Sequence, residues 1–214
     1  MNTLLEIRGV SRRFGGLLAV SKLSFAVEEN QILGLIGPNG AGKSTVFNLI
    51  SGVFKPSEGQ VLYRGSNITG LAPYVVARHG LARTHQIVQP LLAMTVLENC
   101  TVGACFGRED LPLRRAQEAA REAAVFVGLE DRLETPASQL TIAGKKRLEL
   151  ARALASQPTL LMLDEVLAGL NPAEVERMIA VIRRIRARGV SILMIEHLMQ
   201  AIMKVGRASC RERV

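Results

Sequence analysis

The sequence predicts an α/β fold: a mainly parallel β-sheet flanked by helices, with an antiparallel β subdomain at the N-terminus and an inserted helical subdomain. The first observation is a glycine-rich octet, G-P-N-G-A-G-K-S at residues 37–44, between an apolar run and a helix-like run. The second is a pair of wholly apolar runs at 159–163 and 191–195, separated by an amphipathic segment. Wholly apolar strands are typical of a parallel sheet buried on both faces.

Composition favours one globular domain within the 214 residues, because 48% of them are hydrophobic and 21% are charged. No apolar stretch approaches the roughly 20 residues of a membrane span, and no secretory signal is expected. The three cysteines lack metal-site or redox spacing, which indicates a reducing, cytoplasmic setting. The net charge of +8 comes from scattered basic residues with few aromatics, so nucleic acid is not an expected partner.

The first thirty residues alternate apolar and polar side chains, as in antiparallel strands. The inward positions are Leu5, Ile7, Val10, Leu23, Phe25 and Val27. After the octet, residues 44–50 are expected to form a helix. A loop at 52–59 then leads into a short strand at 60–63.

Residues 91–135 are mostly helical in character. The clearest helix runs over 114–127, where Ala, Glu and Arg dominate, and Gly128 is expected to end it. The strand and helix pattern then resumes with the apolar run at 159–163. Strand-helix-strand units predict a right-handed crossover and parallel pairing.

A helix is expected to begin at Asn171, which suits a cap, with Pro172 at its first position and Gly189 ending it. Its apolar stripe consists of Val175, Met178, Ile179, Ile182 and Ile185. The apolar run at 191–195 is the next buried strand.

The octet fits the phosphate-binding pattern G-x-x-x-x-G-K-[ST] and predicts a P-loop NTPase core. Its glycines let backbone N–H groups turn toward an anion, and the following helix adds its positive end. Lys43 is expected to reach the β- and γ-phosphates of ATP, and Ser44 to ligate Mg²⁺. The expected nucleotide-binding residues here are Gly37, Pro38, Asn39, Gly40, Ala41, Gly42, Lys43, Ser44 and Thr45. The alternative is a glycine-rich turn without a ligand.

Asp164 and Glu165 follow the apolar run at 159–163, at the edge where such sheets place their ligands. A carboxylate there can hold the Mg²⁺ that Ser44 also contacts, and the next can accept a proton from the attacking water. The alternative is an ordinary acidic turn after a strand.

Three further side chains are candidates, each with a structural alternative. His197 could contact the γ-phosphate, or cap a strand at the surface. Gln86 could ligate Mg²⁺ or orient water, or be a polar loop residue. Phe14 could stack on adenine, or belong to the sheet core. The basic run at 145–147 is expected to be a solvated helix face rather than a nucleic-acid patch.

With these motifs in order, the chain resembles an ABC-type ATP-binding subunit over residues 4 to 203. The resemblance is carried by Phe14, the octet and Gln86, and then by L-T-I-A-G at 140–144, L-L-M-L-D-E at 160–165, A-G-L-N-P at 168–172 and His197. Within the family it looks most like the importer ATPases for branched-chain amino acids. The telling segments are F-G-G-L-L-A-V, A-R-H-G-L-A-R-T-H-Q, M-T-V-L-E-N, K-R-L-E-L-A-R-A-L, D-E-V-L-A-G-L-N-P and I-E-H.

The resemblance implies an ATPase that uses Mg²⁺ and works as a head-to-tail homo- or heterodimer. ATP would lie between one subunit's phosphate loop and the other's signature segment, which comprises Leu140, Thr141, Ile142, Ala143 and Gly144. Glu165 would be the general base, with His197 and Gln86 beside the γ-phosphate. Asn171 would lie in the loop that crosses the dimer interface.

The resemblance also implies two membrane permease subunits and, indirectly, a periplasmic or extracellular substrate-binding protein. The chain would then be peripheral, at the cytoplasmic face of the inner membrane. The resemblance further divides the ATP-binding domain, residues 1–205, into two parts. One is a β subdomain plus P-loop core (1–90 and 139–205), and the other is a helical subdomain (91–138) that would contact the permease.

Three positions depart from the family pattern. Ile142 and Ala143 stand where the signature L-S-G-G-Q has glycines, which is tolerable if their φ angles stay negative. Val166 replaces a proline after the catalytic glutamate. Asn171 replaces the usual aspartate, as is common in the importer subgroup.

Residues 206–214, G-R-A-S-C-R-E-R-V, back-translate to a widely used short-read sequencing adapter. We expect them to be a translated artefact on a truncated gene; the alternative is a divergent natural basic tail. Three alternative functions remain open at this point. They are the ATPase subunit of an exporter or lipid-extraction system, a soluble ABC ATPase acting on nucleic acid or the ribosome, and a truncated nucleotide-binding fragment without transport activity.

Overall fold

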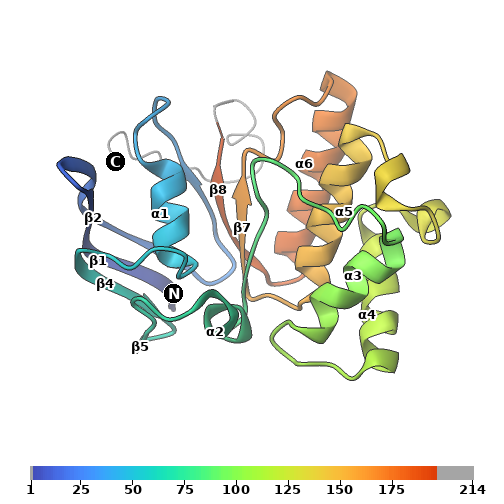
Figure 1. Ribbon diagram of the computed structural model, residues 1–214, viewed down its shortest axis with the longest axis horizontal. Coiled ribbons are helices and arrows are strands. Elements are labelled where there is room, and N and C mark those ends of the chain that lie inside the picture. The colour runs from blue at the N-terminus through green and yellow to red at the C-terminus, as the bar shows by residue number, and fades with distance from the viewer. Residues whose placement is uncertain (1, 197–214) are drawn as a thin grey trace.

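Two four-stranded β-sheets form the centre of residues 2–196, the part of the chain that the computed structural model describes (Figure 1). The antiparallel sheet has the order β2-β1-β4-β5 and contains β1 (Thr3–Phe14), β2 (Leu17–Glu28), β4 (Glu58–Tyr63) and β5 (Ser66–Asn67). The parallel sheet has the order β3-β8-β7-β6 and contains β3 (Ile32–Leu35), β6 (Leu81–Arg83), β7 (Leu160–Asp164) and β8 (Ser191–Ile195). The predicted fold class is therefore confirmed.

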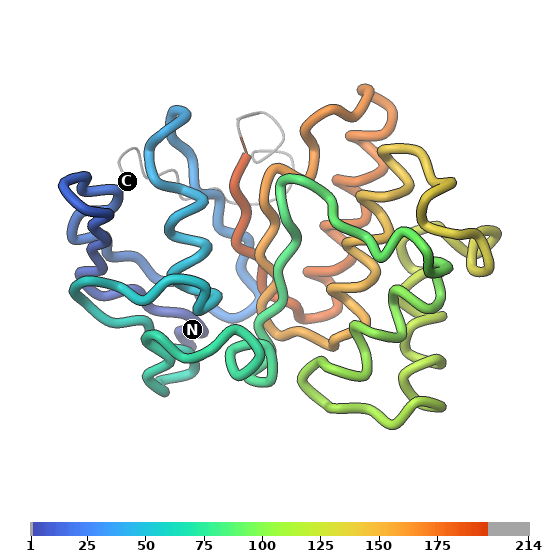
Figure 2. The backbone as a smooth tube through the Cα atoms, in the orientation of Figure 1, coloured from blue at the N-terminus to red at the C-terminus, as the bar shows by residue number. Residues whose placement is uncertain are grey.

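In the described part of the chain, four helices cover the parallel sheet on the side that faces away from the antiparallel sheet. Two shorter helices of this part lie on the other side, between or beside the two sheets (Figure 2). The two shorter helices are α1 (Lys43–Ile50) and α2 (Pro73–Arg78). The other four are α3 (Val96–Cys105), α4 (Leu113–Phe126), α5 (Ile142–Ala155) and α6 (Pro172–Ala187), with the 3₁₀ turns η1 (Glu130–Arg132) and η2 (Ala137–Gln139). No helix in the described range is long and apolar enough to cross a bilayer.

The parallel sheet separates two hydrophobic cores. In β7, Leu161 and Leu163 belong to the core shared with α3–α6, whereas Leu160 and Met162 belong to the core shared with α1 and the antiparallel sheet. The neighbouring strand β8 alternates in the same way. Because successive side chains of a strand point to opposite faces, a wholly apolar strand serves both cores.

The ends of the helices follow from local sequence. The Asn171 side chain accepts a hydrogen bond from the Glu174 N–H at 2.9 Å, and the Glu174 carboxylate accepts one from the Asn171 N–H at 3.0 Å. This reciprocal pair begins α6, with Pro172 next, as predicted. Gly189 follows the end of α6 with φ 86°, a conformation that favours glycine.

Two strands were not predicted, the two-residue strand β5 and the strand β6. Strand β6 has only three residues, which is too short for a periodic pattern, and it is held by parallel pairing of Leu81 with Leu160. Its place in the sheet matters for the site, because it delivers Arg83, Thr84 and Gln86 to the carboxyl end of β7.

Candidate functional site

A cleft of about 640 Å³ contains the phosphate loop, which we define as residues 37–44. Its walls come from four separate parts of the chain. They are Phe14, Leu17, Leu18, Ala19, Asn39, Gly40, Ala41, Gly42, Lys43, Ser44, Thr45, Gln86 and Glu165. Of the predicted nucleotide-binding residues, Phe14 and residues 39–45 thus line the cleft together with Gln86 and Glu165, whereas the signature segment and Asn171 do not.

The backbone of the phosphate loop has the left-handed turns that its glycines predict. Gly40 has φ 82° and Gly42 has φ 85°, and Gly42 caps the N-terminus of α1. Positive φ beside right-handed residues turns successive N–H groups toward one side, which creates a concave site for an anion. The start of α1 adds its partial positive charge to that site.

The Lys43 ammonium group is buried inside the phosphate loop. Its Nζ donates to the carbonyl oxygens of Gly37 at 2.7 Å and Pro38 at 2.8 Å. A buried cation needs such partners, since desolvation without them would be costly. The loop therefore holds a positive charge in place at the floor of the anion site.

Asp164 ends β7 and is 2% exposed. Its Oδ2 accepts from Arg83 Nη2 at 2.9 Å, and its N–H donates to the Thr84 hydroxyl at 3.2 Å. Arg83 is itself held by the Asn48 side chain of α1. The other carboxylate oxygen, Oδ1, is buried with no hydrogen-bond partner. A buried carboxylate oxygen of this kind suits Mg²⁺, or a water bound to it, as a ligand.

Glu165 lies in a different environment from its neighbour Asp164. It lines the cleft, and its Oε2 accepts from Gln86 Nε2 at 2.8 Å. Its backbone has φ 48°, which is uncommon for a residue with a side chain. The left-handed turn directly after β7 leaves one carboxylate buried and the next at the cleft wall.

Phe14 lies at the rim of the cleft rather than in the sheet core. Its side chain is 38% exposed, and its ring meets that of Phe54 edge-to-face with centroids 5.2 Å apart. The Arg12 guanidinium lies 4.6 Å from the Phe14 centroid. Of the two interpretations that the sequence left open, this position favours contact with a ligand in the cleft.

The signature segment lies apart from the phosphate loop, at the start of α5 (Figure 1). The Thr141 hydroxyl caps this helix by accepting from the Gly144 N–H at 3.1 Å. Ile142 and Ala143 form the first helical turn without positive φ, so their side chains fit, and Ile142 is 64% exposed. Ala143 lines a separate pocket with Leu170, beside the capped start of α6. Within a single chain, the signature segment therefore lies outside the cleft that contains the phosphate loop.

The expectation that residues 145–147 form a solvated face is wrong for Lys146. This side chain is 7% exposed, and its Nζ donates to the backbone carbonyls of Glu165 and Val166, at 3.1 Å each. The spacing of Ala143, Lys146, Leu150 and Ala153 places Lys146 on the buried face of α5, a signal present in the sequence. His197 and residues 206–214 lie outside the described residues.

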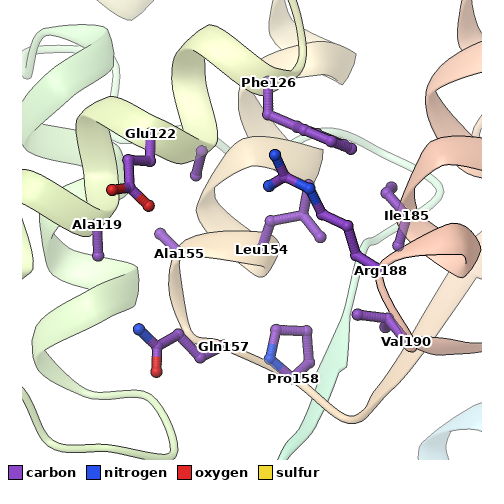
Figure 3. A pocket seen from close by; sticks show the side chains of 11 residues that line it. Ala119, Glu122, Phe126, Leu154, Ala155, Gln157, Pro158, Ile185, Arg188 and Val190 are labelled. Carbon is purple, nitrogen blue, oxygen red and sulfur yellow. The ribbon is translucent and has the colours of Figure 1, made fainter.

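A smaller pocket of about 180 Å³ lies between α4, α5 and α6 (Figure 3). Its walls are mostly apolar, and the Arg188 guanidinium lies 4.1 Å from the centre of the Phe126 ring. None of the predicted site residues within the described range line it. The candidate site is therefore the cleft of the phosphate loop.

Comparison with known proteins agrees with this geometry. The family model described as ABC transporter matches residues 20–168. The chain is 42% identical to the high-affinity branched-chain amino acid transport ATP-binding protein LivG of Salmonella typhimurium, and 39% identical to BraF of Pseudomonas aeruginosa, covering 94% of this chain and 85% of each relative. The ADP conformation of MJ1267, an ATP-binding cassette of an ABC transporter, matches with a TM-score of 0.88 and 29% identity over 98% of this chain and 87% of that one. The chain therefore belongs to the ABC transporter family, as an ATP-binding cassette.

Proposed function

We propose that this chain is the ATP-hydrolysing subunit of a membrane importer for branched-chain amino acids. The observation that carries the proposal is the cleft in which the phosphate loop meets Gln86 and Glu165. The substrate class rests on the relatives, which are named as branched-chain amino acid transport ATP-binding proteins. The substrate itself is expected to contact other subunits.

The roles of the residues follow from their chemistry. The amides of residues 37–45 and the Lys43 ammonium hold the phosphates of ATP, and the exposed face of Phe14 contacts the base. Ser44, Gln86 and Asp164 would hold Mg²⁺, which would supply positive charge to offset the negative charge of the phosphates.

Glu165 acts as the general base. Its carboxylate accepts a proton from the water that attacks the γ-phosphorus, while the bond from that phosphorus to the bridging oxygen of ADP breaks. The Gln86 Nε2 donates to Glu165 Oε2 at 2.8 Å and so orients this carboxylate. The same side chain senses the γ-phosphate of bound ATP. His197 contacts the γ-phosphate in this proposal.

A second ATP-binding subunit, identical or paralogous, completes the site. The signature segment lies at the start of α5 and away from the phosphate loop of the same chain. In a head-to-tail pair, the partner supplies its residues 140–144 and the loop with Asn171. ATP then stabilises the closed pair, because its contacts are complete only there.

The permease contact is assigned to an apolar groove of about 520 Å³ beside α2 and α3. Exposed hydrophobic side chains at its edge, Val53, Leu91 and Phe106, suit the burial of a short helix from one of two permease subunits. Through this contact the chain would lie at the cytoplasmic face of the membrane. A periplasmic or extracellular binding protein delivers the solute to the other side.

Lys43→Ala tests the phosphate site. The substitution removes the buried cation, so ATP affinity should fall by at least tenfold while the fold is retained. Isothermal titration with ATP measures the affinity, and circular dichroism checks the fold. Wild-type affinity in a folded Lys43→Ala protein rules out the assigned phosphate site.

Glu165→Gln tests the chemical role. ATP binding should persist, whereas turnover should fall by about 10² to 10⁴, the range for loss of a general base. Release of inorganic phosphate gives the rate. A Glu165→Gln protein that hydrolyses ATP at the normal rate removes Glu165 from this role.

The importer assignment needs the assembled transporter. The chain should co-purify with two permease subunits, and in vesicles a leucine-loaded binding protein should stimulate ATP hydrolysis and leucine uptake. Hydrolysis that drives outward lipid movement would instead identify an exporter or lipid-extraction system. Nucleotide binding without turnover in the assembly would identify an inactive fragment.

A further inference from the structure

The turn that carries Glu165 is fixed by contacts from two separate parts of the chain, helix α5 and the end of strand β8 with the residue that follows it. The Glu165 N–H donates to the Ile195 carbonyl of β8 at 3.0 Å. Lys146 of α5 donates from Nζ to the carbonyls of Glu165 and Val166, at 3.1 Å each. The Leu167 N–H donates to Glu196 Oε1 at 3.0 Å. Residues 165–167 are thus held on both their carbonyl and amide sides.

The two charged side chains in this arrangement are both buried. Lys146 is 7% exposed and Glu196 is 2% exposed. Burial lowers the pKa of the Lys146 ammonium, and the carboxylates of Glu196, Glu149 and Glu165 act in the opposite direction. Burying a charged side chain is costly unless it is hydrogen-bonded, and it contributes little net stability even then. The presence of these two side chains is therefore better explained by the backbone geometry that their hydrogen bonds impose than by stability.

That geometry is an uncommon one. Glu165 has φ 48°, in the left-handed region where side chains are disfavoured. A conformation of this kind persists only where the surroundings enforce it. Here it directs the Glu165 carboxylate to the cleft, within 2.8 Å of the Gln86 amide nitrogen.

We propose that Lys146 and Glu196 are positioning residues that hold the left-handed turn of Glu165 in its reactive orientation. Lys146 lies on the helix that begins at the signature segment, so it also joins that segment to the general base. A shift of α5 when a partner binds ATP then reaches Glu165 through one side chain. This inference rests on the proposed role of Glu165.

Lys146→Met tests the proposal, because methionine keeps an unbranched side chain of similar length but lacks the ammonium group that donates to the two carbonyls. The turnover number for ATP should fall at least tenfold, since a displacement of about 1 Å can cost roughly 100-fold. The dissociation constant for ATP should stay within about twofold, because Lys146 does not line the cleft. Lys146→Arg, which keeps the donors, should recover most of the turnover.

The matched control is Lys145→Met, which removes the same charge from the preceding residue of α5 and should leave turnover unchanged. If Lys146→Met does not fold, Glu196→Gln and Glu196→Met replace it. The Gln variant still accepts from the Leu167 N–H and should retain turnover, whereas the Met variant should lose it. Normal turnover in Lys146→Met, or an equal loss in Lys145→Met or Lys146→Arg, overturns the proposal.

A double-mutant cycle separates this proposal from the proposed function. If Lys146 acts through Glu165, then Lys146→Met should have no further effect on the residual turnover of Glu165→Gln. Additive losses overturn the positioning role and leave the function intact. If Glu165→Gln alone leaves turnover unchanged, the assigned function of Glu165 fails first.

Discussion

Adjacent acidic residues have opposite surroundings in this structure. Asp164 is buried against Arg83, whereas Glu165 lines the cleft beside Gln86. The change from extended strand to left-handed backbone between them separates the two carboxylates. One sequence motif thus offers a buried oxygen for a metal ion and a cleft-facing oxygen for a proton.

Phe14→Ala tests the contact with the base. Stacking of a base on an aromatic ring contributes about 1–3 kcal/mol, so ATP affinity should fall by roughly tenfold. Phe14→Tyr should bind ATP like the wild type, and affinity for GTP should be similar because stacking tolerates any base. Titration of each variant with labelled nucleotide measures these constants.

The control for Phe14 is Phe54→Leu, which alters the neighbouring ring without changing a residue of the cleft wall. Its ATP affinity should remain within about twofold of the wild type. Unaltered affinity in Phe14→Ala would place the base elsewhere in the cleft.

At single positions, the sequence predicts most where the chemistry is local. The phosphate loop is such a case, because its glycines, Lys43 and Ser44 are consecutive. The ion pair of Arg83 with Asp164 was not predicted, since it joins strands 81 residues apart in the chain. The buried position of Lys146 was missed for a different reason: three adjacent basic residues were interpreted as one exposed group.

Among the elements, α6 shows how a helix start is encoded by two side chains. Asn171→Ala removes the acceptor for the Glu174 N–H and should lower the free energy of unfolding by about 1 kcal/mol. Asn171→Asp should unfold like the wild type, because aspartate is an equally good cap and its charge favours a helix N-terminus. Urea denaturation followed by circular dichroism compares the three proteins. Equal loss in both variants would show that the cap is not the source of the effect.

Elements with a strong local pattern were predicted close to their observed bounds. The predicted helix at 114–127 corresponds to α4, and Gly128 follows it with φ 78°. Strand β6 shows where this approach ends, because its three residues carry no periodicity and its position depends on β7. The domain boundaries at residues 90 and 138 stay predictions.

On the scale of the whole molecule, Cys100 reports on the core shared by α3–α6. Its side chain is fully buried there, and burial raises the pKa of its thiol to about 12. Iodoacetamide at pH 8 should therefore leave Cys100 unmodified in the native protein and modify it in urea, because the thiolate is the reactive form. Cys105, which is partly exposed on the same helix, should react in the native protein.

Peptide mass spectrometry measures both cysteines in one sample, so Cys105 is an internal control. Rapid modification of Cys100 without urea would show that α3 opens while the rest of the protein stays folded.

Successive side chains of β7 alternate between the two hydrophobic cores, so the number of residues in this strand is constrained. Deleting one residue before Asp164 would turn each preceding side chain to the opposite layer, and Leu161 would exchange cores with Met162. Deleting two would restore the faces but draw Glu165 back by about 7 Å, the advance of two residues in a strand. This strand can therefore accept many apolar substitutions, yet no change in its number of residues leaves both its packing and its terminal acids in place.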